Sequence, residues 1–105
     1  MPRLLNDQER DGLRLNYPAW QRLENRDAIG RTFLFPDFKT AFAFMQQCAE
    51  YAEQIDHHPE WLNIWNRLEV VLATHSAGGL TSLDLQLAEF MDQAANAIGL
   101  QHSRA

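Results

Sequence analysis

The sequence lacks the features that mark secreted, membrane-spanning and disulfide-stapled proteins. It contains one cysteine, Cys48, so an intrachain disulfide framework is excluded. No apolar run approaches the roughly 18 residues that indicate a membrane span. Charged residues near the start, among them Arg3 and Asp7, interrupt any secretory signal. Together these absences favour a reducing compartment, and we expect a cytoplasmic protein that has no membrane as a partner.

Basic residues are also scarce. Nine Lys and Arg stand against 14 Asp and Glu, which gives a formal net charge of −5. Such a chain repels phosphate backbones on average, and its basic residues are scattered instead of forming a stripe. We therefore expect no direct binding to nucleic acid. The remaining composition is ordinary for a globular protein, and the length fits a single domain over residues 1–105.

The first third of the chain predicts a short helix followed by strands. Residues 4–15 are typical of a weak helix, in which Asn6 and Glu9 have the spacing of a capping box. Residues with high β-propensity then predict two strands between residues 20 and 35. A turn at residues 24–27 is expected to join them.

The strongest helix is predicted over residues 37–56, with Asp37 as its N-cap. We expect it to end at His58, because Pro59 disfavours helical geometry in the residue before it. Its apolar stripe comprises Phe38, Ala41, Phe42, Met45, Ala49 and Ala52, and is widened by Phe44, Cys48, Tyr51 and Ile55. So wide a stripe predicts contact with another subunit, and burial of the whole stripe in the monomer core is the alternative. On either reading Cys48 is a core residue and not a nucleophile.

The last part of the chain predicts a hairpin and a second long helix. Strands are expected over residues 61–65 and 68–75 with a turn at residues 66–67, and a helix over residues 81–98. Thr81 and Asp84 have capping-box spacing at the start of that helix, so we interpret Asp84 as a structural cap and not as a catalytic group. The elements together predict an α+β fold, in which helices cover one face of an antiparallel sheet.

Three histidines lie at the predicted ends of segments. His57 and His58 close the long helix and His75 ends a strand, whereas His102 lies in the polar tail and carries no argument. Side chains at segment ends can converge on one pocket. Imidazole can give or take a proton near neutral pH because its unperturbed pKa is about 6.5. The sequence therefore predicts acid–base catalysis by His57, His58 and His75.

Other interpretations of these residues stay open at this point. Single histidines at segment ends commonly contact only solvent or a helix dipole. Metal binding is a further alternative, although the sequence shows neither a zinc-ligand spacing nor a helical i, i+4 histidine pair. Glu53 lies one helical turn before His57, so it could orient that imidazole or simply solvate the helix surface.

A longer pattern connects the same residues. An acidic residue, a His-His-Pro triplet, an aromatic residue, a later histidine and an aspartate occur at Glu53, His57, His58, Pro59, Trp65, His75 and Asp84. This pattern resembles that of the pterin-4a-carbinolamine dehydratases, and the similarity extends over about residues 4–98. Trp65 departs from the tyrosine that many members of that family carry.

The resemblance implies a four-stranded antiparallel sheet with helices on one face, and assembly into a homodimer or homotetramer. It implies dehydration of 4a-hydroxytetrahydropterin to quinonoid dihydropterin, with no metal and no organic cofactor. We expect His57 and His75 to handle the protons while His58 positions the substrate. By position, the substrate contacts fall at His57, His58, Pro59, Thr74, His75, Ser76 and Ala77.

The resemblance also implies a biological setting. The dehydration would recycle the pterin cofactor of aromatic amino-acid hydroxylases, which would be functional partners. Vertebrate members of the family also serve as dimerisation cofactors of a homeodomain transcription factor, so a protein-interaction module is the alternative function. The three histidines favour the enzyme, because a purely structural role does not need them.

Overall fold

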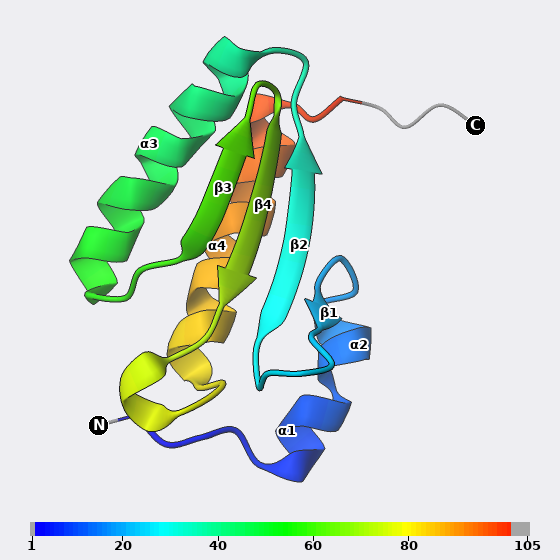
Figure 1. The fold of residues 1–105 in the computed structure, drawn as a ribbon, viewed down its shortest axis with the longest axis vertical. Helices are drawn as coiled ribbons and strands as arrows, with labels where there is room; N and C mark the ends of the chain where they lie inside the picture. Colours follow the sequence, from blue (N-terminus) through cyan, green and yellow to red (C-terminus); the bar gives the residue numbers. More distant parts are fainter. Residues whose placement is uncertain (1, 102–105) are drawn as a thin grey trace.

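The computed structural model describes residues 2–101, so His102 lies outside the described part (Figure 1). The elements in chain order are α1 (Asp7–Asp11), α2 (Leu13–Asn16), β1 (Gln21–Arg22), β2 (Ile29–Leu34), α3 (Phe38–Ile55), β3 (Glu60–Ile64), β4 (Arg67–Leu72), the 3-10 helix η1 (His75–Ala77) and α4 (Ser82–Ile98). None of the helices within residues 2–101 combines the length and the apolar character needed to cross a membrane.

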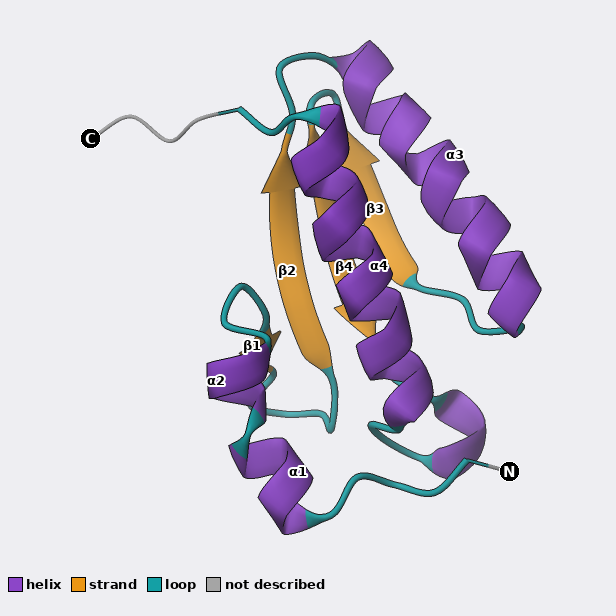
Figure 2. Ribbon diagram, turned by 180° about the vertical axis from the view of Figure 1, so that it is seen from behind, coloured by secondary structure: helices purple, strands orange, loops and turns teal. Residues whose placement is uncertain are grey.

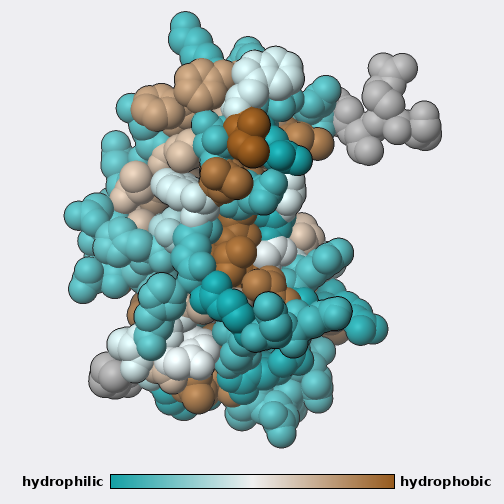
Figure 3. Space-filling model, viewed as in Figure 1, coloured by the Kyte–Doolittle hydropathy of each residue, from teal (hydrophilic) through white to brown (hydrophobic). Residues whose placement is uncertain are grey.

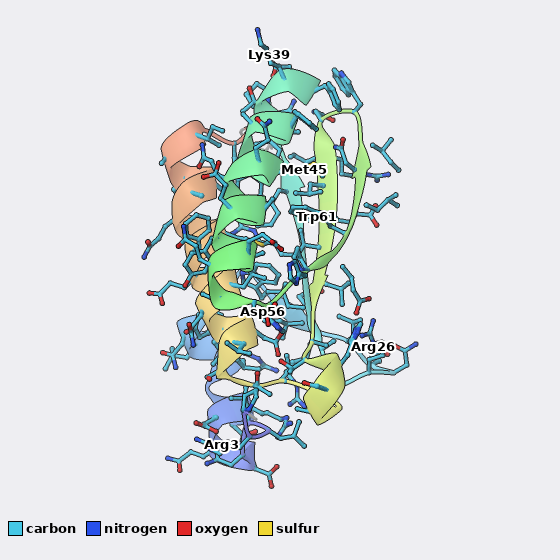
Figure 4. All side chains as sticks on the ribbon, turned by 90° about the vertical axis from the view of Figure 1, so that its left-hand side faces the viewer. Arg3, Arg26, Lys39, Met45, Asp56 and Trp61 are labelled. Atoms are coloured by element: carbon cyan, nitrogen blue, oxygen red, sulfur yellow. The ribbon has the colours of Figure 1, made fainter. Side chains whose placement is uncertain are left out.

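The strands form one antiparallel sheet in the order β1-β2-β4-β3. Helices α3 and α4 lie on the same face of it, as the views from behind and from the side show (Figures 2 and 4). This confirms the predicted α+β class with helices on one face. The β3–β4 turn is one residue earlier than predicted: Ile64 pairs with Arg67, so Trp65 and Asn66 form the turn.

Alternation along the strands builds the core. Leu68, Val70 and Leu72 of β4 are buried under the helices, as the sequence pattern predicted. Phe33 of β2 packs against Phe44 of α3, with ring centroids 5.0 Å apart. Aromatic pairs at such a distance add to the stability gained from the buried area itself.

The buried side of α3 includes Ala41 and Ala52 of the predicted stripe together with residues of its widening. Phe44 and Cys48 are fully buried, whereas Phe38 and Phe42 of the main predicted stripe are about half exposed, at 47% and 49%. Cys48 is thus a core residue, as predicted, and burial raises the pKa of its thiol to about 12. The space-filling view shows hydrophobic side chains gathered over the upper parts of α3 and β3 (Figure 3). Exposed large hydrophobic residues in this region are Leu34, Phe38, Phe42, Leu62, Ile64 and Trp65.

The N-terminal segment is fastened to the other end of the sheet. The predicted capping box of Asn6 and Glu9 is present, but the expected single helix is divided at Gly12 into α1 and α2. Leu4 does not belong to the helix, because it pairs as an isolated β-bridge with Thr81. The short helices therefore begin only after the chain has passed the start of α4.

Asp27 joins this segment to the loop before α4. Its carboxylate accepts hydrogen bonds from Arg10 Nε at 3.1 Å, from Arg10 Nη2 at 2.6 Å and from the backbone N–H of Leu80 at 3.0 Å. The hydrogen bonds from Arg10 are the main cause that lowers the pKa of Asp27. A Cβ atom on Gly79 would overlap this carboxylate, so the tight approach depends on glycine.

We expect Gly79→Ala to lower the free energy of unfolding by about 1–3 kcal/mol, because the methyl group would push Asp27 away from Arg10 and Leu80. Urea denaturation followed by circular dichroism measures this change. Gly12→Ala is the matched control and should be close to neutral, since the nearest atom to its added Cβ belongs to the flexible Asn16 side chain. Equal stability of Gly79→Ala and the unchanged protein would contradict the assigned packing.

Candidate active site

The end of α3 turns His57 toward the interior. The helix ends at Ile55, and not at His58 as predicted, because Asp56 adopts a left-handed conformation with φ 51°. The backbone N–H of His57 still reaches the carbonyl of Ala52, at 3.0 Å. Such a left-handed cap satisfies the last carbonyls of the helix and reverses the chain. His57 therefore follows the helix, at a position from which its ring reaches α4.

His57 pairs with the buried carboxylate of Asp84. The Nε2–Oδ1 distance is 2.6 Å, and the exposed fractions of the two side chains are 8% and 0%. The predicted capping box is present as well: Asp84 Oδ2 accepts from the backbone N–H of Thr81, at 2.9 Å. Asp84 is thus the structural cap that the sequence predicted, and it also has a direct contact to His57 that spacing did not reveal. Its place in the family pattern was the one signal that could have pointed to this contact.

Thr74, the residue before His75, belongs to the same hydrogen-bond network around Asp84. Its hydroxyl donates to Asp84 Oδ2 at 2.8 Å, and its oxygen lies 2.7 Å from Thr81 Oγ1. Since the single proton of Thr74 goes to Asp84, the hydroxyl of Thr81 donates to Thr74. Thr81 Oγ1 in turn accepts from the backbone N–H of Leu83, at 3.2 Å. Both oxygens of Asp84 and the hydroxyls of Thr74 and Thr81 therefore all have hydrogen-bond partners.

His58 lies at the surface beside Glu53. Its Nε2 is 2.5 Å from Glu53 Oε2, and the two side chains are 55% and 76% exposed. Of the two roles that the sequence left open for Glu53, an orienting contact to His57 is wrong, because the carboxylate contacts His58 instead. The i, i+4 spacing applies only within a helix, and the left-handed Asp56 breaks that geometry before His57 is reached.

His75 also has a carboxylate partner. The prediction that His75 ends a strand is wrong. Strand β4 ends at Leu72, and His75 is the first residue of the 3-10 helix η1. Its Nε2 is 2.8 Å from Glu60 Oε2. Arg26 donates to both oxygens of Glu60, at 2.9 and 2.8 Å, and this hydrogen bonding, followed by that of His75, lowers the pKa of Glu60 to about 2. Spacing in the sequence gave no sign of Glu60 or Arg26.

The contacts join the two segments that carry the predicted substrate-binding residues. Residues 57–60 and 74–77 are bridged on the inside by Asp84 and on the outside by the His75–Glu60 contact. Pro59 and Ala77 are half-buried in these segments, and Ser76 is exposed. Beside them is a hollow of about 370 Å³, lined by Arg26, Asp27, Ala73, Thr74, His75, Gly78 and Gly79.

The common feature of the three histidines is a carboxylate at Nε2. An ionised carboxylate accepts a proton from Nε2–H, so the lone pair of a neutral ring then lies on Nδ1. A ring held in this way can take a proton at Nδ1 and pass it on. Within residues 2–101 no cluster of three or more His, Cys, Asp or Glu side chains could hold a metal ion.

Comparisons with known proteins show which proteins this chain is similar to. Over residues 3–94 the chain matches the family described as Pterin 4 alpha carbinolamine dehydratase. A protein from Rhizorhabdus wittichii, provisionally named pterin-4-alpha-carbinolamine dehydratase, is 50% identical over 91 residues, or 87% of this chain and 94% of that protein. One of the same provisional name from Brucella ovis is 54% identical over 77 residues, or 73% of this chain and 79% of that protein.

A solved structure is also similar. The crystal structure of a transcriptional coactivator/pterin dehydratase from Brucella melitensis has a TM-score of 0.84 and 48% sequence identity to this chain. The match covers 88% of this chain and 98% of that one. The similarity therefore includes nearly the whole fold.

We expect Thr74→Val to lower the free energy of unfolding by about 1–3 kcal/mol, because Asp84 and Thr81 would each lose a buried hydrogen-bond partner. Thr74→Ser is the matched control: it keeps the hydroxyl and should restore most of the stability. Thermal or urea denaturation of the two variants measures the difference. If Thr74→Val were as stable as Thr74→Ser, the hydroxyl network would not contribute as described.

Proposed function

Because this chain belongs to the pterin 4 alpha carbinolamine dehydratase family, we propose that it removes water from 4a-hydroxytetrahydropterin and releases quinonoid dihydropterin. The observation that carries this proposal is the set of three histidine–carboxylate pairs on two adjoining segments. The reaction is a hydro-lyase reaction, so its chemistry requires movement of protons and no net oxidation.

The dehydration breaks the C4a–O and N5–H bonds and forms an O–H bond of water and the C4a=N5 double bond. The C4a–O bond breaks, and the departing hydroxyl takes a proton and leaves as water. The proton on N5 is removed, and its electron pair forms the C4a=N5 double bond. A general acid at the hydroxyl and a general base at N5 therefore suffice, and each typically accelerates such a step about 10²–10⁴-fold.

In this proposal His57 and His75 transfer the two protons and His58 positions the hydroxyl or the ring. Buried Asp84 keeps the Nδ1 atom of His57 as the proton-exchanging atom, and Glu60 does the same for His75. The edge of the pterin lies against Pro59 and against residues 74–77, where backbone groups can hydrogen-bond it. No metal and no organic cofactor takes part.

We further propose that the reaction recycles the pterin cofactor of aromatic amino-acid hydroxylases, and that it takes place in the cytoplasm. The single cysteine, held as a buried thiol, supports a reducing compartment.

A second candidate function is that of a protein-interaction module. It is favoured by the name of the Brucella melitensis structure, which calls that protein a transcriptional coactivator as well as a pterin dehydratase. The two candidates differ in a direct assay: absence of carbinolamine turnover at micromolar protein would favour the interaction role.

The exposed apolar side of α3 supports assembly into a homodimer or homotetramer. Phe38 and Phe42 stack with centroids 6.0 Å apart, and about half of each side chain faces solvent. A second copy of the chain is the occupant we propose for this surface. Burying one such phenylalanine contributes about 1.5–3 kcal/mol when it is complete.

The catalytic proposal predicts large losses of turnover in His57→Ala and His75→Ala, by about 100-fold or more in kcat, and a smaller loss in His58→Ala. Decay of 4a-hydroxytetrahydropterin, followed spectroscopically, measures these rates. His102→Ala is the control, because this histidine lies outside the family pattern. Since His57 is buried, His57→Asn offers a variant that still provides Asp84 with a polar partner. Three near-normal rates in folded variants would refute the proposed roles.

The assembly proposal predicts that the protein sediments as a dimer or tetramer and that Phe42→Glu shifts it to smaller species. A charge in place of this ring cannot be buried without a large desolvation cost. Gln47→Glu adds the same charge to an exposed position of the same helix that points away from Phe38 and Phe42, and it should leave the assembly unchanged. A monomeric unchanged protein, or assembly that survives Phe42→Glu, would argue against this surface.

A further inference from the structure

We propose that Glu60, held in place by Arg26, is a positioning residue for His75. It fixes the imidazole with its proton on Nε2 and its lone pair on Nδ1, directed to the reaction. This inference rests on the proposed function and deepens it, because it names two residues outside the family pattern as parts of the same site. It stands on contacts among three segments that are distant in the sequence.

The carboxylate of Glu60 lies where these segments meet. Arg26 comes from the loop between β1 and β2, Glu60 opens β3, and His75 opens η1. The side view shows Arg26 projecting from its loop on the side of the sheet away from α3 (Figure 4). Arg26 donates from Nη1 to Oε1 of Glu60 and from Nη2 to Oε2. The same Oε2 atom also lies 2.8 Å from His75 Nε2. A two-point arginine contact fixes the plane of a carboxylate, which a single contact does not.

This carboxylate can only accept hydrogen bonds. Arg26 keeps the pKa of Glu60 at about 2, so the group is ionised at any pH near neutrality. The atom that faces it must therefore carry a proton, and this atom is Nε2 of His75. The neutral imidazole is thus restricted to one of its two tautomers, with Nδ1 unprotonated.

The ring of His75 needs such a partner more than that of His57 does. The side chain of His75 is 75% exposed, so packing alone does not hold its orientation. An exposed ion pair contributes little in water. A flat ring system that covers the neighbouring hollow, to which Arg26 and His75 both contribute, would exclude water and strengthen the contact.

Glu53 beside His58 lacks this third member. Its side chain is 76% exposed, and its contact to His58 is the one ion pair it makes within the described residues. The Arg26–Glu60 pair therefore distinguishes the His75 contact from the other surface pair. A carboxylate that is itself anchored transmits its position to the ring, in the same way that outer-shell partners orient ligating histidines.

The test combines imidazole ¹⁵N NMR with steady-state kinetics on the full chain. In the unchanged protein, above the pH at which His75 loses its charge, its spectrum should be that of the Nε2–H tautomer. In Glu60→Gln the amide can donate or accept, so both tautomers should appear. We expect kcat to fall by about tenfold or more while KM changes by less than roughly twofold.

Further variants separate position from charge. Glu60→Asp keeps the acceptor and should recover part of kcat and of the tautomer preference, and Arg26→Gln should weaken both less than Glu60→Gln does. Glu69→Gln is the matched control, since among residues 2–101 the one ion pair of Glu69 is with Arg67, on the open face of the sheet. An unchanged His75 tautomer and unchanged kcat in Glu60→Gln would overturn the proposal. Because the NMR signal needs no turnover, failure of the proposed dehydratase activity would be recognised separately, by inactivity of the unchanged protein.

Discussion

The fully buried carboxylate of Asp84 is the interaction on which the site and the start of α4 both depend. One of its oxygens holds His57, and the other accepts from Thr74 and from the backbone N–H of Thr81. A buried charge is costly unless hydrogen bonds and a favourable field compensate it. Here the N-terminus of α4 supplies the field, because its free N–H groups and dipole favour a negative charge. Burial of this carboxylate therefore requires His57, Thr74 and the Thr81 backbone N–H together.

This anchoring divides the three histidines into one fixed ring and two adjustable ones. His57 is held between the end of α3 and the start of α4, so its position changes only if these helices move. His58 and His75 are exposed and depend on surface carboxylates for their orientation. In the proposed reaction a small substrate would reach this site without opening the core, since His58 and His75 are at the surface. The buried ring of His57 would be the fixed point of that site.

The sequence was sufficient for the elements and insufficient for the partners. Asp37 and Thr81 predicted their helix starts because capping is a local property that needs only neighbouring residues. A contact of Glu53 to His57 was one of two roles that the spacing allowed. It does not form because one left-handed residue, Asp56, ends the helical periodicity, and nothing in the spacing reveals such a conformation. The capping role alone accounts for an aspartate at position 84, so spacing did not point to its contact with His57, 27 residues earlier in the chain. The Glu60–His75 contact depends on how the end of β4 meets the start of β3, which is a tertiary property.

The same limit explains why the pattern of α3 identified a helix but only part of its buried side. Apolar residues lie on both sides of this helix, so periodicity fixes the element and leaves its rotation undetermined. The rotation places Phe38 and Phe42 outside, in the first turns of a helix of 18 residues, about 27 Å long. His57 comes two residues after the last residue of α3, Ile55, at the opposite end of the helix. Figure 1 shows how far apart the two ends of α3 lie. A surface that joins copies of the chain at the first turns can therefore be buried while the histidines at the other end stay open to substrate. Under the proposals for assembly and for catalysis, the two roles would lie at opposite ends of one helix and would not compete for the same surface.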